Sequence, residues 1–276
     1  MLLKFFFLTY VASWLLFAAA ACVLHGASSA SGIGFIGSLL FLPGAIMPAV
    51  VAVLLTARVE GKPGVSMLLQ GIVRWNVNLR WYVFALGYMI AIKGSVAILY
   101  RCFTGAWPAF GQIPWFIMAI GIVFSTPVQA GEEIGWRGYA LPRLAERFGL
   151  GLASIILGIL WACWHLPFFF ISGSDNYGQS FSSYLIAVTA LSVTMAWLYW
   201  RTNASLLLTM VMHAAVNNTG GIVRSPLSSS LAANPFAFNP SLVAWLIVIL
   251  LWLPAVYFLS QMHRRSASLA TARLPN

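Results

Sequence analysis

Eight long apolar runs follow one another along this 276-residue chain, and they constrain its fold more than any other feature. A helix needs about 20 apolar residues to cross a bilayer, and each run is close to that length. Only 7% of the residues are charged, whereas soluble domains carry about 25%. We therefore expect an all-α, polytopic transmembrane helix bundle that forms one membrane domain over residues 1–276. The expected spans are about 5–24, 35–57, 81–100, 113–130, 151–171, 182–200, 203–222 and 241–260.

The basic residues indicate how these spans are oriented. With both termini cytoplasmic, Arg101 and Arg224 lie on the outer side, and Lys93 falls within a span. The remaining Lys and Arg residues then all lie in cytoplasmic segments, as the positive-inside rule requires. We expect a multi-pass integral protein of a bacterial-type cell (inner) membrane. The cytoplasmic set is Lys4, Arg58, Lys62, Arg74, Arg80, Arg137, Arg143, Arg147, Arg201, Arg264, Arg265 and Arg273.

Two segments between spans are amphipathic, at residues 58–80 and 132–149, and we expect short interfacial helices there. The net charge of +10 is explained by cytoplasmic loops that face anionic lipid headgroups. Membrane lipids are thus expected partners, and nucleic acid is not. The three cysteines have no metal-type spacing and are expected to be free thiols.

Two adjacent carboxylates, Glu132 and Glu133, lie at the end of the fourth apolar run. An ionisable side chain in the bilayer costs about 2.5–3.5 kcal/mol, so such residues usually face the protein interior and have a function. Arg137 follows Glu133 by four residues, so the two share a helix face and can pair. We interpret Glu133 as the structural partner of Arg137 and Glu132 as the freer carboxylate.

Two histidines also lie inside apolar runs. Pro167 disfavours helical geometry at the preceding residue, so the fifth helix should bend just past His165. The i,i+4 spacing of His213 and Asn217 places both on one face of the seventh helix. A single such histidine is often only a helix–helix contact, and the carboxylate pair could be a packing ion pair. The coincidence of three apolar segments that each carry such a group favours a functional site.

In chain order these residues read Glu-Glu-x-x-x-Arg at 132–137, aromatic-x-x-x-His at 161–165 and His-x-x-x-Asn at 213–217. The ordered set resembles the CAAX-protease and bacteriocin-processing family of intramembrane glutamate peptidases, which are related to the Ras-converting CAAX endopeptidases. The motif core spans about 120–222. The second motif usually begins with Phe in this family, whereas Trp161 stands there in this chain.

The resemblance implies an intramembrane endopeptidase that cleaves membrane-associated protein or peptide substrates, in CAAX-type or bacteriocin-type processing. Carried over by position, Glu132 and His165 would activate a water molecule as general base. His213 and Asn217 would donate hydrogen bonds to the oxyanion. Amide hydrolysis requires such a base and preorganised oxyanion donors in a dry site.

By the same resemblance, Arg137 would hold the first motif together through Glu133. The favoured mechanism is independent of metal and needs no cofactor. A zinc metallopeptidase is the alternative, in which Glu132, His165 and His213 would bind the ion and lower the pKa of its water. The absence of H-E-x-x-H spacing and the expected commitment of Glu133 to Arg137 count against it.

Two further functions compete with the peptidase. One is a non-catalytic membrane scaffold or bacteriocin-immunity protein on the same fold, although every motif position is filled here. The other is a small proton-coupled transporter, in which Glu and His form a relay. A transporter of that kind predicts broken helices and an internal repeat, and neither is visible in the sequence.

The span assignment raises one geometric difficulty. His165 lies about 15 residues into its span, nearly 22 Å from the cytoplasmic side at about 1.5 Å per residue. Glu132 is nominally close to that side. The site closes only if the helix that carries Glu132 dips into the membrane, or if the fifth span begins deeper in the sequence.

Overall fold

The computed structural model describes residues 1–26, 35–225 and 228–271. Over this part of the chain the secondary structure is helical, apart from an isolated antiparallel bridge between Phe110 and Val223. Six of the described helices are long and apolar enough to cross a membrane, judged by length and composition. The expected all-α, multi-pass fold is confirmed, and the side of the membrane on which each terminus lies stays a prediction.

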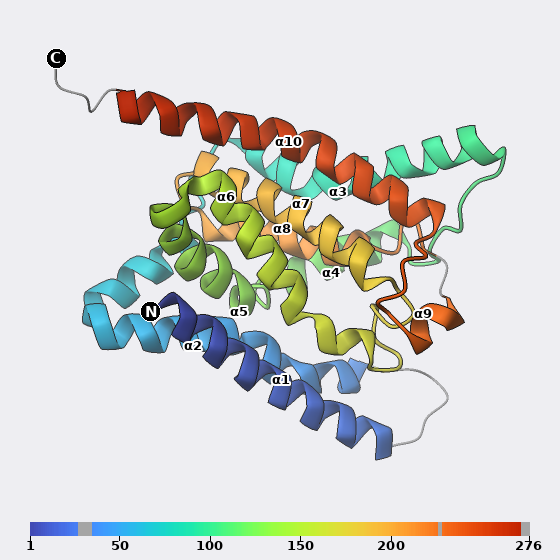
Figure 1. Ribbon diagram of the computed structural model, residues 1–276, viewed down its shortest axis with the longest axis horizontal. Helices are drawn as coiled ribbons and strands as arrows, with labels where there is room; N and C mark the ends of the chain where they lie inside the picture. The colour runs from blue at the N-terminus through green and yellow to red at the C-terminus, as the bar shows by residue number, and fades with distance from the viewer. Residues whose placement is uncertain (27–34, 226–227, 272–276) are drawn as a thin grey trace.

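Helix α7 (Phe181–Arg201) is the central helix of the bundle. Its apolar window is 72% buried inside the protein, compared with 22 to 44% for the other long helices. It packs against α6 (Leu141–Trp164) and α10 (Leu242–Thr271), which Figure 1 shows around it. The outer helices can expose apolar surface to lipid, so the burial of α7 identifies it as the scaffold of the bundle.

Small residues allow α6 and α7 to pack closely. A Cβ atom at Gly158 would lie 2.7 Å from the Cα of Thr189, so glycine is required at this crossing. Beside it, the Ser192 hydroxyl donates a hydrogen bond of 2.9 Å to the carbonyl of Ser154. Close approach through small residues is a common mode of helix association in membranes.

Helices α1 (Leu2–Gly26) and α2 (Phe35–Gln70) pack together as a pair at one side of the bundle (Figure 1). Helix α2 changes direction at Gly61, which has φ 65°, a value that glycine adopts without strain. The separate interfacial helix expected at 58–80 is therefore wrong in its bounds. Its first part is the arm of α2 beyond Gly61, and it continues into the short 3-10 helix η1 (Gly71–Val73).

The fourth crossing extends well beyond residue 130, where the apolar run ends. Helices α4 (Trp115–Ser125) and α5 (Ala130–Glu133) are followed by a π-helix, η2 (Ile134–Ala140), and then by α6. Helix α8 (Leu206–Thr219) runs antiparallel alongside. A Cβ at Gly121 would meet Asn218, and one at Gly138 would meet Leu206 at the other end of α8.

Helix α6 reverses direction at Gly149, whose φ is 73° and ψ is 157°. Residues 141–148 complete the fourth crossing, and residues 150–164 return along it. The segment predicted as a separate interfacial helix at 132–149 is thus part of a longer helical arm, whose first residues, 132–137, are buried and whose last turn, residues 146–148, is exposed. The helix ends at Trp164, and the 3-10 helix η3 (Leu166–Phe169) follows, which confirms the bend expected just past His165.

All eight apolar runs form helices, but two of these helices are short. Helix α4 has 11 residues and α8 has 14, about 17 and 21 Å at 1.5 Å per residue, less than the bilayer core of about 30 Å. The rest of the described chain comprises α3 (Leu79–Thr104), which packs against α8 and α10, and the short α9 (Ser229–Ala233).

Candidate active site

Glu133 lies at the centre of a buried group of charged side chains. Its Oε1 accepts a hydrogen bond of 2.7 Å from Nη1 of Arg137, the pairing that the i,i+4 spacing predicts. The same oxygen lies 2.8 Å from Nδ1 of His213, which comes from α8. The side chains of Glu133 and Arg137 are fully buried, and that of His213 nearly so. The carboxylate of Glu133 therefore links Arg137 of η2 to His213 of α8.

Arg137 has further contacts with aromatic and sulfur groups. Its guanidinium carbon lies 4.2 Å from the centroid of the Trp161 ring, within the range of a cation–π interaction. Nη2 donates to Sδ of Met195 on α7 at 3.3 Å. Because breaking one side of a buried ion pair leaves a charge without a partner, this arrangement depends on both Arg137 and Glu133.

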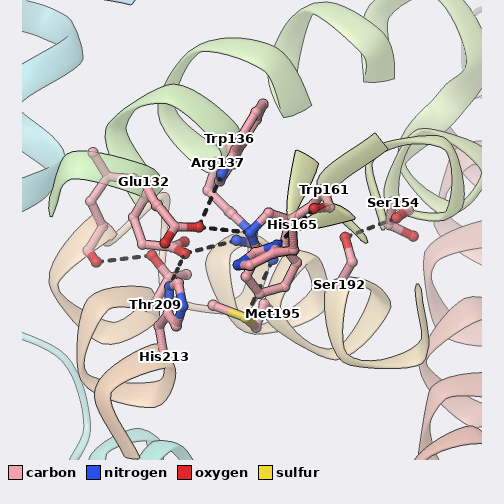
Figure 2. Close-up of polar contacts among 12 residues, drawn as sticks. Glu132, Trp136, Arg137, Ser154, Trp161, His165, Ser192, Met195, Thr209 and His213 are labelled. Carbon is pink, nitrogen blue, oxygen red and sulfur yellow. Dashed lines mark hydrogen bonds and ion pairs between the residues drawn. The ribbon is translucent and has the colours of Figure 1, made fainter. Parts of the chain in front are cut away.

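Glu132 is not free, although it does not bind Arg137. Its Oε2 accepts two indole N–H hydrogen bonds, from Trp161 at 2.7 Å and from Trp136 at 3.3 Å (Figure 2). Among the hydrogen bonds of the described residues, none reaches Oε1. Oε2 is thus held by two donors, and Oε1 is available to accept a hydrogen bond or a proton. The contact with Trp161 also resolves the geometric difficulty of bringing Glu132 near His165. It places Glu132 beside the C-terminal end of α6, the end that is capped by His165.

His165 caps the C-terminal end of α6 and is half-buried. Its Nδ1 lies 2.9 Å from the backbone carbonyl of Trp161. A carbonyl oxygen can only accept, so Nδ1 must carry a proton, and Nε2 of the neutral ring is left with its lone pair. His165 also interacts electrostatically with Glu132. The ring is therefore oriented so that Nε2 can accept a proton.

The tautomer of His213 follows from the same reasoning. An ionised carboxylate is acceptor only, so the nitrogen that faces Glu133, Nδ1, carries a proton. Nε2 then donates a hydrogen bond only when the ring is protonated on both nitrogens. In addition, the ring of His213 meets that of Trp161 edge-on, with centroids 5.2 Å apart.

Asn217 lies one turn beyond His213 on α8 and is exposed. No hydrogen bond in the described part of the chain joins it to the buried group. Its neighbour Asn218 is the residue with defined partners, because its amide donates to Ser125 Oγ at 2.8 Å and to Ala214 O at 2.9 Å. The role of Asn217 stays a prediction.

Two glycines allow α2 to approach the backbone on either side of the carboxylates. A Cβ at Gly131 would lie 3.0 Å from the Cα of Ile46, and one at Gly135 would lie 2.5 Å from the Cβ of Pro48. The π-helix begins immediately after Glu133. Such segments often occur at functional sites, where the extra residue per turn redirects side chains. Here the packing of α2 holds this segment in place.

Three features of the site were missed by reasoning from the sequence. Trp136 follows Glu132 by four residues, so its place on the same helix face was a signal that could have been used. The hydrogen bond from the indole N–H of Trp161 was not predicted, because the motif specifies only an aromatic residue at that position. Met195 gave no signal, since it is one apolar residue among many in a transmembrane helix.

Comparison with known proteins finds two similarities. Residues 112–219 match the family model described as Type II CAAX prenyl endopeptidase Rce1-like, a range that includes all six predicted site residues. The chain is also 28% identical over 231 residues to the CAAX prenyl protease 2 of Methanococcus maripaludis, covering 78% of this chain and 82% of that relative. Over these residues the chain is similar to CAAX prenyl endopeptidases. These similarities support an intramembrane protease.

These similarities do not decide whether a metal takes part. Among the described residues, no three His, Cys, Asp or Glu side chains are grouped as a set of metal ligands. The predicted zinc set was Glu132, His165 and His213. In the structure the oxygen Oε2 of Glu132 and Nδ1 of each histidine have protein partners, and Oε1 and the two Nε2 atoms do not. Those atoms are of the kind that zinc binds, so the zinc alternative stays untested.

Proposed function

We propose that this protein is an intramembrane endopeptidase that hydrolyses peptide bonds by a water molecule activated by Glu132 and His165. The observation that carries the proposal is the state of the Glu132 carboxylate. Two indoles hold Oε2, and no hydrogen bond from the described residues reaches Oε1. A carboxylate that is oriented in this way deep in an apolar bundle is suited to act as a general base.

In the proposed reaction, a water molecule lies between Oε1 of Glu132 and Nε2 of His165. One proton of the water passes to this pair while its oxygen attacks the carbonyl carbon of the scissile bond. The resulting tetrahedral intermediate collapses as the C–N bond breaks. The same proton is then returned to the leaving nitrogen. Water is the only co-reactant, so no serine or cysteine nucleophile is needed.

Stabilisation of the oxyanion falls to α8 in this proposal. The doubly protonated His213 donates from Nε2, and Glu133 balances its charge through Nδ1 at 2.8 Å. The exposed amide of Asn217 is the proposed second donor. Arg137 acts indirectly, because it binds the same carboxylate oxygen and holds Glu133 in place. Removal of one oxyanion donor in other enzymes costs about 10²–10³ in kcat.

We further propose a substrate of the CAAX type, a membrane-associated chain cleaved near its prenylated C-terminus. The support is the name of the archaeal relative and the description of the matching family model. Bacteriocin-type processing is the alternative within the same family. The proposed location is a bacterial-type cell (inner) membrane, and the favoured mechanism is independent of metal.

The proposal is tested with the purified protein in liposomes. Farnesylated and unmodified peptides that end in a CAAX sequence, and a membrane-tethered peptide library, are incubated with it and the products are analysed by mass spectrometry. In ¹⁸O-labelled water the new carboxylate should carry one label from direct attack. Binding of the peptides without any cleavage would instead favour a non-catalytic scaffold or immunity protein.

A further inference from the structure

We infer that Trp161 is the positioning residue of the site, and that its indole N–H selects which oxygen of Glu132 acts as the base. This inference rests on the proposed function, in which Glu132 activates water. It concerns the aromatic position of the second motif. A phenyl ring cannot donate a hydrogen bond, so the contact of Trp161 with Glu132 depends on the indole N–H.

The geometry singles out Trp161 among the aromatic residues near Glu132. Its hydrogen bond to Oε2 is 2.7 Å long, whereas that from Trp136 is 3.3 Å. Both indoles donate to the same oxygen, so the lone pairs of Oε2 are engaged and its basicity is reduced. Oε1 is left as the oxygen that can receive a proton.

Trp161 also contacts the remaining charged groups of the site. The face of its ring lies 4.2 Å from the guanidinium carbon of Arg137, and its edge meets His213 at a centroid distance of 5.2 Å. Its backbone carbonyl accepts from Nδ1 of His165. One residue of α6 thus orients the proposed base, its histidine partner and the Arg137–Glu133 pair (Figure 2).

Another nearby tryptophan lacks this role. Trp164, one turn further along α6, is also buried, but its Nε1 has no hydrogen-bond partner. Burial of an indole in this aromatic region therefore does not by itself require a carboxylate partner. The contrast indicates that the hydrogen bond of Trp161 is specific to Glu132.

The first test replaces Trp161 by Phe, which keeps an aromatic ring over Arg137 and removes the N–H. Hydrogen bonds to charged groups correspond to about 10- to 100-fold in an equilibrium, so we expect kcat to fall by about that factor. KM should stay within about twofold, because the change affects the base and not substrate binding. Trp136→Phe should have a smaller effect, since it removes the longer bond.

The matched control is Trp252→Phe on α10. This substitution also removes an indole N–H hydrogen bond, of 3.1 Å to the carbonyl of Ile186, but at a helix contact away from the site. It should leave kcat and KM unchanged. If Trp161→Phe retains wild-type kcat while Glu132→Gln is inactive, the inference is wrong and the proposed function still stands.

A second readout does not need activity. With ¹⁵N-labelled tryptophan, the indole signal of Trp161 is assigned by its loss in Trp161→Phe, and we expect it to move in Glu132→Ala, which removes the acceptor of its hydrogen bond. The signal of Trp164, whose Nε1 has no hydrogen-bond partner among the described residues, should stay in place. An unmoved Trp161 signal would overturn the inference whether or not the protein proves to be a peptidase. A moved signal in a protein that cleaves nothing would support the hydrogen bond but reject the proposed function, and with it the selection of a base.

Discussion

Nδ1 of His213 and Nη1 of Arg137 bind the same carboxylate oxygen, Oε1 of Glu133, at 2.8 and 2.7 Å. The two donors come from different helices, one from α8 and the other from η2. Glu133 is therefore more than the ion-pair partner of Arg137, since it also sets the tautomer of His213. The two adjacent glutamates consequently have different partners: Glu133 binds a guanidinium and an imidazole, and Glu132 binds two indoles.

The Glu133–Arg137 pair should contribute strongly to stability. Glu133→Ala removes the carboxylate partner of the buried Arg137, and Arg137→Ala leaves Glu133 with His213 alone. Breaking one side of a buried pair typically costs about 3–5 kcal/mol of unfolding free energy. The double variant should lose less than the sum, by a coupling of about 1 kcal/mol or more. Thermal unfolding in detergent measures this cycle. Additive losses would show that the pair is not coupled.

An exposed ion pair serves as the control for that cycle. Arg143 and Glu60 also form an ion pair, but their side chains are 27% and 42% exposed. Alanine at either position should cost about 0–1 kcal/mol. Should Glu132 couple to Arg137 more strongly than Glu133 does, the assignment of the two carboxylates would have to be exchanged.

Gly135 should not tolerate alanine. The added Cβ would lie 2.5 Å from the Cβ of Pro48 and 2.6 Å from its carbonyl carbon, so α2 would have to move. Overpacking of this kind costs about 1–3 kcal/mol, and it should also displace the adjacent carboxylates and lower activity. Gly94→Ala on α3 is the control, because its Cβ would meet nothing within 4 Å. Equal melting temperatures for the two variants would contradict the close packing.

The interaction that sequence reasoning reached is local, and most of those it missed are long-range; the missed contact of Glu132 with Trp136, one turn along the helix, is the local exception. The Glu133–Arg137 contact follows from helical spacing alone. The predicted fourth span ended too early because hydropathy falls at Glu132 and Glu133. A hydropathy profile cannot distinguish polar residues that are buried in the protein from polar residues at the membrane interface. The contacts of Glu132 with Trp161 and of Glu133 with His213 depend on the reversal at Gly149 and on the placement of α8. Neither of these can be read from a spacing.

Removal of metal should not affect the reaction if Glu132 and His165 activate water directly. We expect dialysis against a chelator to leave the turnover of a membrane-tethered peptide unchanged. Elemental analysis is the accompanying measurement. One zinc per chain, with activity lost on its removal and restored on its return, would establish the zinc alternative.

The orientation of the bundle can be tested by labelling single cysteines. Arg147 and Asp175 are both exposed, the first in the arm before Gly149 and the second between η3 and α7. In a background that lacks the three native cysteines, Arg147→Cys should react only from the cytoplasmic side and Asp175→Cys only from the other. Reaction of position 175 from the cytoplasm would refute both the eight-span topology and the cytoplasmic termini. Arg265, another expected cytoplasmic position, lies outside the described side chains.

The central claim is that Glu132 is the base, and turnover by Glu132→Gln tests it most directly. Glutamine keeps the shape of the side chain and an oxygen that can accept from Trp161, but it cannot take a proton from water. Glu146→Gln, an exposed change further along the same arm, is the matched control and should leave turnover unchanged. We predict that Glu132→Gln, folded and inserted as the wild type, cleaves a membrane-tethered peptide at least about 10²-fold more slowly. Wild-type turnover by this variant would contradict the account.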